Sequence, residues 1–433
     1  MIGSRVKEQG ARQRAKGKGQ RAKTPCSMLY ALCIILLTVA VGIAHPTPVF
    51  AEEPVFLNDL IKYAADNNPK IKAAKLGWAR MIQKYPQAVA LEDPMLKYSY
   101  PTERMETRYE LMLSQKFPFP GKLGLEGDMV AKEVEMAKAM YDKEARDVIV
   151  AVKKSFYELF YIDNAIALTE QNKNVLEHFT KVGTTDYALD ATALNDVLRA
   201  QSQYAQVSYD LILLKEMRAA EMTRLNTLLN REPEHKIEGL EKPPVKPFEH
   251  SLDDLYKLAS NNEDVKIAET KIKKDEIGAS ISKYKYLPEF ELGLNYKDIM
   301  ETSRDETLVT FGISIPLWFS KNKAANEEAR INHEKSVQEK NAIKNEVYNQ
   351  IKNIYFRITN SDRLVKLYSS SLIPQAQRSM EIAETWYRER QGSLSGLLET
   401  QGIFYNFQLA YYRAVADYLK NIAEMEMVTG KRL

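Results

Sequence analysis

The chain has 433 residues, of which 45% are apolar and 27% charged, and this composition excludes an intrinsically disordered protein. Eight of its 61 basic residues and one of its 58 acidic residues lie in the first 51 positions. The remainder has 53 basic against 57 acidic residues, so the overall charge of +3 gives no support to a nucleic-acid partner.

Residues 1–51 have the order of a secretory signal peptide. Basic residues precede Met28, and the stretch from Leu29 to Ala44 is almost wholly apolar. This apolar run is short for a membrane-spanning helix, and small residues around Ala51 fit a cleavage site. We expect cleavage before Glu52 and export of the mature chain.

Both cysteines of the chain, Cys26 and Cys33, lie in this signal segment. The mature protein is therefore expected to have no disulfide, no thiol nucleophile and no thiolate metal site. A lipid anchor on Cys33 is not expected either, because Leu32 precedes it where a small residue is usual.

The mature chain repeats itself at an interval of about 195 to 200 residues, which indicates an internal duplication. Residues 57–60 (LNDL) return as residues 252–255 (LDDL). Tyr187 and Leu194 return as Tyr387 and Leu394. Several prolines mark the segment between the two halves. The sequence predicts a first repeat over 52–231, a linker over 232–250 and a second repeat over 251–433.

Short helices open each repeat, and each then carries two strands with alternating apolar and polar residues. In the first repeat the strands lie between Pro94 and Pro118, and in the second between Pro288 and Pro316. A period of 2 puts one apolar and one polar face on each strand. The apolar residues expected on one face are Leu111, Leu113, Leu292, Leu294, Phe311 and Ile313.

Two long helices follow the strands in each repeat. Apolar residues recur every three or four positions from Val130 to Ile166, and no proline occurs over 122–185. A helix of this length is about 95 Å long. The second repeat has its counterpart over 321–387, where Pro374 should interrupt the helix and kink it. The helices alone favour an ordinary bundle or coiled coil.

The strands favour a membrane β-barrel over a half-buried soluble sheet. Tyrosines near the strand ends suit the membrane interface, and the chain is expected to be exported. A sheet in lipid must close, because open edges leave backbone groups without partners. One chain offers four strands and two chains would give a filled eight-stranded barrel, whereas three chains give twelve strands around a lumen. The six apolar residues would then face lipid.

Several segments resemble the TolC-like outer-membrane efflux proteins over essentially all of the mature chain. They are the double repeat itself, residues 67–69 (NNP), residues 115–123 (QKFPFPGKL), residues 225–233 (LNTLLNREP) and residues 429–430 (TG). The segment 115–123 is the most specific, and it is similar to the branch that includes heavy-metal efflux ducts. The resemblance implies a homotrimer whose 12-stranded barrel crosses the outer membrane and continues as a long α-helical barrel in the periplasm.

The resemblance also implies partner proteins and a functional tip, which is the turn between the paired long helices. The partners are a periplasmic adaptor protein and an inner-membrane pump, which supplies the energy and sets the substrate. In the family, the turn between the paired long helices forms the periplasmic gate and the adaptor contacts. The positions that correspond to this tip are Tyr187, Asp196, Arg199, Tyr387, Arg390 and Glu399.

The match at the tip is incomplete in four places. Asp190 and Arg390 stand where the family has glycine, Gly396 replaces the first acidic residue of the second repeat, and Arg199 replaces the second acidic residue of the first. We expect Tyr187, Asp196, Tyr387, Arg390 and Glu399 to help hold the entrance closed, because opposite charges can brace a closed ring. Because of these departures, the resemblance does not predict how the entrance closes or which adaptor binds.

The mature chain shows no sequence pattern of an enzyme. Its four histidines, His178, His235, His250 and His333, have no metal-ligand spacing, and phosphate-binding, dinucleotide-binding and nucleophile-elbow motifs do not occur. We expect no catalytic activity, no cofactor and no bound metal. Acidic residues on the long helices are expected to be solvated faces.

Two alternatives to an efflux duct stay open at this stage. One is a duct for type I protein secretion, and the other is a periplasmic coiled-coil adaptor or scaffold that never enters a membrane. Strand pairs in corresponding places of both repeats favour a duct, because a scaffold does not need them.

Overall fold

The computed structural model describes residues 55–103, 107–189, 192–237, 239–299 and 305–432. The signal peptide expected over 1–51 and the departure expected at Asp190 lie outside these residues. The predicted helices and strands of the mature chain are confirmed. The first half contains α1 (Leu57–Asn67), α2 (Pro69–Ile82), α3 (Tyr85–Ala88), β1 (Met95–Ser99), β2 (Thr107–Phe117), α4 (Lys122–Ala188) and α5 (Leu194–Leu229).

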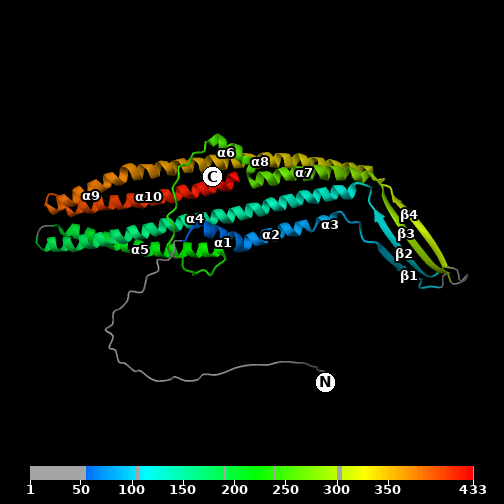
Figure 1. The fold of residues 1–433 in the computed structure, drawn as a ribbon, viewed down its shortest axis with the longest axis horizontal. Helices are drawn as coiled ribbons and strands as arrows, with labels where there is room; N and C mark the ends of the chain where they lie inside the picture. Colours follow the sequence, from blue (N-terminus) through cyan, green and yellow to red (C-terminus); the bar gives the residue numbers. More distant parts are fainter. Residues whose placement is uncertain (1–54, 104–106, 190–191, 238, 300–304, 433) are drawn as a thin grey trace, which may run out of the picture. The chain divides into compact units, whose positions relative to one another are not determined.

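The second half contains a corresponding set of elements (Figure 1). These are α6 (Leu252–Leu258), the short 3₁₀ helix η1 (Ala259–Asn261), α7 (Glu263–Lys283), the 3₁₀ helix η2 (Tyr284–Tyr286), β3 (Glu289–Ile299), β4 (Asp305–Ser314), α8 (Phe319–Leu367), the π-helical turn η3 (Tyr368–Leu372), α9 (Ile373–Arg388) and α10 (Leu394–Thr429).

The long helix α4 has 67 residues and buries the stripe that its periodicity predicts. Val148, Val152, Phe156 and Leu159 are buried against α1 and α5. Among the described residues, no helix combines the length and the apolar character that a membrane-crossing helix needs.

The predicted interruption at Pro374 is confirmed, and it takes the form of the π-helical turn Tyr368–Leu372. Proline has no N–H, and its ring clashes with the carbonyl of the residue four positions earlier. That residue is Ser370, which lies inside the π turn. The helix therefore widens for one turn before α9 begins.

Two buried asparagines, Asn68 and Asn262, occupy the position before corresponding helices, α2 in the first half and α7 in the second. The side-chain oxygen of Asn68 accepts from the backbone N–H of Lys70, and its amide donates to the carbonyl of Leu228 at 2.7 Å. Asn262 accepts from the N–H of Asp264 and donates to the carbonyl of Val428 at 2.9 Å. Each asparagine caps a helix and ties its start to the end of the last long helix of the same half.

The four strands form one antiparallel sheet in the order β1-β2-β3-β4. β2 and β3 are neighbours although they lie far apart in the sequence, and the two strand pairs therefore merge into a single sheet. In the described part of the chain, one edge of β1 and one edge of β4 have no strand beside them.

The helices nearest the sheet follow the same order as the strands. α4 packs against α2 on one side and α7 on the other, and α7 packs against α8. At the far end, α4 packs between α5 and α10, and α10 packs against α9 (Figure 1). The strands thus form one layer and the helices another. One edge of each layer comes from the first repeat: β1 in the strand layer, and α2 and α5 in the helix layer. The other edge comes from the second repeat: β4 in the strand layer, and α8 and α9 in the helix layer.

Candidate functional site

One face of the sheet is apolar from β1 to β4. Residues directly opposite each other in paired strands share a face, and the register pairs Leu113 with both Leu96 and Leu294, and Leu294 with Val309. The register also pairs Leu292 with Phe311. All six residues predicted on one apolar face therefore lie on it: Leu111, Leu113, Leu292, Leu294, Phe311 and Ile313.

In a sheet that covers the core of a water-soluble protein, the apolar face is buried and the polar face is exposed. In this sheet strongly exposed residues lie on the apolar face, and two residues of the polar face are buried. On the apolar face Val309 is 75% and Phe311 67% exposed, whereas Ser114 and Asn295 on the polar face are 4% and 8% exposed. The amide of Asn295 donates to the carboxylate of Glu110, so the polar face forms its own hydrogen bonds. An apolar face of this extent on the outside needs an apolar environment.

Aromatic side chains border the apolar face at the end that is farther from the helices. The rings of Tyr98 and Tyr109 lie 6.1 Å apart, and those of Tyr109 and Tyr296 also lie 6.1 Å apart. Tyrosine has an apolar ring and a polar hydroxyl, which suits a boundary between apolar and aqueous surroundings.

The predicted tip residues lie at the ends of the long helices, where α4 turns into α5 and α9 turns into α10. Tyr187 is in the last turn of α4 and is exposed, and Asp196 is in the first turn of α5. Tyr387 is in the last turn of α9, and Glu399 is exposed near the start of α10. The structure thus brings both predicted turns to the same end of the helix layer.

Two side-chain hydrogen bonds join the two turns. The hydroxyl of Tyr387 donates to Oδ2 of Asp186 at 2.7 Å, and the guanidinium of Arg199 donates to the hydroxyl of Ser395. Burial of the Tyr387 hydroxyl, followed by its hydrogen bond to Asp186, raises the pKa of this phenol to about 12. The Tyr387 hydroxyl therefore stays a donor at neutral pH.

Sequence reasoning missed Asp186 and Ser395 as members of the tip. One signal for Asp186 was present, because an acidic residue in the last turn of a helix is opposed by the helix dipole and needs another role. Ser395 carries no comparable signal. Its role depends on the packing of α10 beside α5.

Arg390 stands where glycine was expected, and its backbone adopts the conformation that glycine favours. Its φ is +59°, in the left-handed region that costs a residue with a side chain about 1–2 kcal/mol. The turn is closed by the N–H groups of Gln391 and Gly392, which both donate to the carbonyl of Trp386. In the part of the chain that the structure describes, Arg390 and Glu399 form no ion pair with each other.

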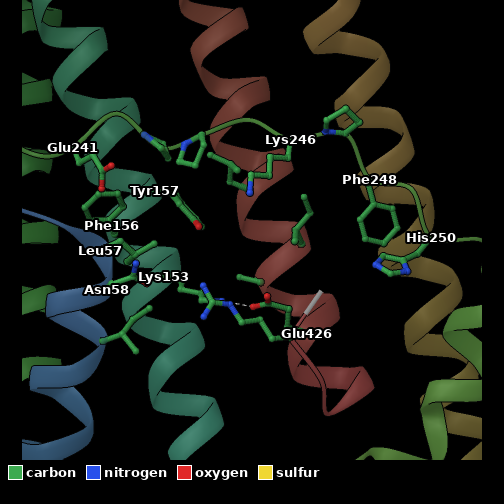
Figure 2. A pocket seen from close by; sticks show the side chains of 18 of the residues that line it. Leu57, Asn58, Lys153, Phe156, Tyr157, Glu241, Lys246, Phe248, His250 and Glu426 are labelled. Atoms are coloured by element: carbon green, nitrogen blue, oxygen red, sulfur yellow. Dashed lines mark hydrogen bonds and ion pairs between the residues drawn. The ribbon is translucent and has the colours of Figure 1, made fainter.

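A cavity of about 420 Å³ lies under the linker, between α1, α4 and α10. Figure 2 shows the linker crossing above Lys153 and Tyr157, with the Lys153 ammonium paired to the Glu426 carboxylate. The hydroxyl of Tyr418 donates to the carbonyl of Lys246 at 2.7 Å and fastens the linker to α10. This cavity belongs to the joint between the two halves.

Among the described residues, no group of three or more His, Cys, Asp or Glu side chains could hold a metal ion. His178, His235 and His250 are exposed and His333 is half-buried. The candidate functional surfaces described above are the apolar sheet face and the tip.

The chain resembles outer-membrane channels in its family model and in its fold. The model for outer membrane efflux proteins matches residues 60–231 and 255–431. Among curated proteins, none matches the chain in sequence. The fold is similar to that of VceC from Vibrio cholerae at 15% identity, with a TM-score of 0.75 over 87% of this chain and 96% of that one.

Two further channels have a similar fold. The open state of MtrE from Neisseria gonorrhoeae matches at 15% identity, with a TM-score of 0.70 over 87% of this chain and 89% of that one. CmeC from Campylobacter jejuni matches at 12% identity, with a TM-score of 0.72 over 86% of this chain and 85% of that one.

Proposed function

Since the chain belongs to the outer membrane efflux protein family, we propose that it is the exit duct of a tripartite efflux system. In this role it conducts substrate passively through the periplasm and the outer membrane. The observation that carries the proposal is the sheet whose apolar face is exposed while Ser114 and Asn295 on its polar face are buried. Lipid is the environment that makes such a face stable.

The working duct is a homotrimer. The strand layer and the helix layer end at the same two edges of the chain, one in each repeat. A sheet in lipid needs partners for both edge strands, and three copies of a four-stranded sheet make a twelve-stranded barrel with a lumen. Exposed apolar residues on both edges support this closure, among them Tyr209 and Ile212 of α5 and Phe356 of α8.

The two halves are structural repeats of one ancestral unit, over 52–231 and 251–433, joined by the linker 232–250. The matching roles of Asn68 and Asn262 support this division. Residues 1–51 are the signal peptide that directs export. The chain thus supplies two similar walls of the duct.

The partners are a periplasmic adaptor and an inner-membrane pump. α4 starts beside the sheet and ends at the tip, so its 67 residues span about 100 Å between the membrane and the entrance. The tip residues Tyr187, Asp196, Arg199, Tyr387, Arg390 and Glu399 form the periplasmic entrance and its adaptor contacts. A passive duct leaves the choice of substrate to the pump.

A test separates the duct from a periplasmic scaffold. Thr102→Cys, in the exposed loop between β1 and β2, is expected to react with a membrane-impermeant maleimide on intact cells, because this loop faces outward. The matched control is Leu189→Cys, which is also exposed in the chain but lies at the tip, and it should react only after cell lysis. If Thr102→Cys also reacts only after lysis, the sheet does not cross the outer membrane and the duct is wrong.

A further inference from the structure

The segment that joins β4 to α8 exposes three consecutive large apolar residues. Leu317 is 66%, Trp318 75% and Phe319 66% exposed, although the turn itself is well ordered by hydrogen bonds. The N–H of Asn322 donates to the carbonyl of Trp318, and the buried side chain of Asn322 donates to the carbonyl of Lys285 at 2.9 Å. The three side chains are therefore held outward by a fixed backbone.

The corresponding junction of the first repeat is covered within the chain. There Phe119 follows β2, and its ring lies 6.2 Å from that of Tyr284 and 6.4 Å from that of Phe290. The two junctions occupy matching places, after the second strand and before the long helix of each repeat. Only the second leaves its aromatic residues uncovered, so the exposure is a feature of that segment and not of the fold.

The exposed segment continues the apolar face of the sheet. Ile313 is on that face, and Ile315 and Leu317 follow it at the period of an extended chain. Two exposed lysines, Lys321 and Lys323, come directly after it. A tryptophan between an apolar surface and basic residues is the usual composition of a membrane interface, where the lysines reach lipid phosphates.

The distance to the tyrosine row fits a bilayer. Tyr296 pairs with Thr307 on β4, and Leu317 comes ten positions after Thr307. At about 3.4 Å per residue and a tilt of about 40°, this stretch covers about 26 Å along the membrane normal. The apolar band of outer-membrane barrels is about 25 Å tall and has aromatic residues at both borders.

We propose that Leu317, Trp318 and Phe319 form a phospholipid-binding anchor at the periplasmic border of the membrane, which helps to fix the depth of the duct. The proposal rests on the proposed function, because it takes the sheet to lie in lipid. The competing occupant is the neighbouring copy, since β4 is an edge strand.

Tryptophan fluorescence tests the anchor, because the chain has only three tryptophans. Trp78→Phe with Trp386→Phe leaves Trp318 as the sole indole. This protein is placed in phosphatidylcholine vesicles whose lipids carry bromine either near the headgroup or deep in the acyl chains. The emission of Trp318 should fall about twofold with the shallow bromines and less with the deep ones, since indoles lie at the interface.

Two control proteins, each with a single tryptophan elsewhere in the chain, show how to interpret the quenching of Trp318. A protein that retains only Trp386, at the tip, should not be quenched. Phe311→Trp in a background without the three native tryptophans places the probe on the sheet face, where the deep bromines should quench it more. Quenching of this probe without quenching of Trp318 would show that a neighbouring copy covers the segment, and it would overturn the anchor while leaving the duct intact. Absence of quenching at both positions would overturn the duct as well.

Discussion

The hydroxyl of Tyr387 lies 2.7 Å from Oδ2 of Asp186, and this hydrogen bond joins the last turn of α9 to the last turn of α4. The two residues come from different repeats, 201 positions apart in the sequence. The bond therefore holds the two turns of the tip together.

Tyr387→Phe should open the entrance more often. The substitution removes one hydrogen bond of about 0.5–1.5 kcal/mol and shifts a closed-to-open equilibrium by about 2- to 10-fold. Single-channel recording in planar bilayers measures the change as a higher open probability. Tyr187→Phe is the matched control, because Tyr187 occupies the corresponding position but is exposed. Equal effects of the two variants would contradict a specific role of the Asp186 contact.

Burial of the Tyr387 hydroxyl, together with the same bond, should make this tyrosine titrate at a higher pH than an exposed one. The pKa of Tyr387 is raised from 10.0 to about 12, so the stability that this pair contributes is present below pH 10 and is lost as the pH rises through about 12. The difference in ultraviolet absorbance between the wild type and Tyr387→Phe isolates this phenolate. A midpoint near pH 10 would show that the hydroxyl is neither buried nor bonded in solution.

Arg390→Gly separates the charge of Arg390 from its backbone conformation. Glycine adopts the φ of +59° without strain, so this variant should keep or raise stability by up to about 1 kcal/mol. If the charge helps to hold the entrance closed, Arg390→Gly and Glu399→Ala should both raise the single-channel conductance. Unchanged conductance in both variants and in the double variant would remove these residues from the gate.

Arginine scanning of the sheet should distinguish its two faces. Leu294→Arg places a charge on the apolar face and should cost about 2–4 kcal/mol if the site is near the middle of the bilayer. Leu308→Arg is the matched control, because Leu308 pairs with Asn295 on the polar face of the same sheet. The yield of folded trimer in outer-membrane fractions measures both. Equal tolerance at the two leucines would exclude a lipid-facing apolar side.

The two buried asparagines should contribute equally to stability. Asn68→Ala and Asn262→Ala each remove a helix cap and the donor to a carbonyl at the end of a long helix, so each should lower the free energy of unfolding by about 1–3 kcal/mol. Asn58→Ala, at an exposed position of α1, should change it by less than about 0.5 kcal/mol. Thermal unfolding followed by circular dichroism measures the three variants. A large effect at only one of the two buried sites would mean that the repeats have diverged in their packing.

The sequence by itself determined the elements, because their signals are local. A helix repeats every 3.6 residues and a strand every 2, so the stripe along α4 and the alternation in β3 can be recognised without a partner. The π-helical turn before Pro374 is also a local consequence, since it follows from a missing N–H and a clash with residue 370. Within each strand the apolar residues share a face for the same reason, whereas the pairing register decides that the three strands present them on one face of the sheet.

Tertiary structure alone decided which separate segments meet. The pairing of β2 with β3 joins segments more than 170 residues apart, and no local period specifies such a neighbour. The Asp186–Tyr387 bond and the Arg199–Ser395 bond likewise depend on how the helix pairs pack. The covering of Phe119 is of the same kind, because its ring packs against Tyr284 and Phe290 of the second half, whereas Trp318 is exposed.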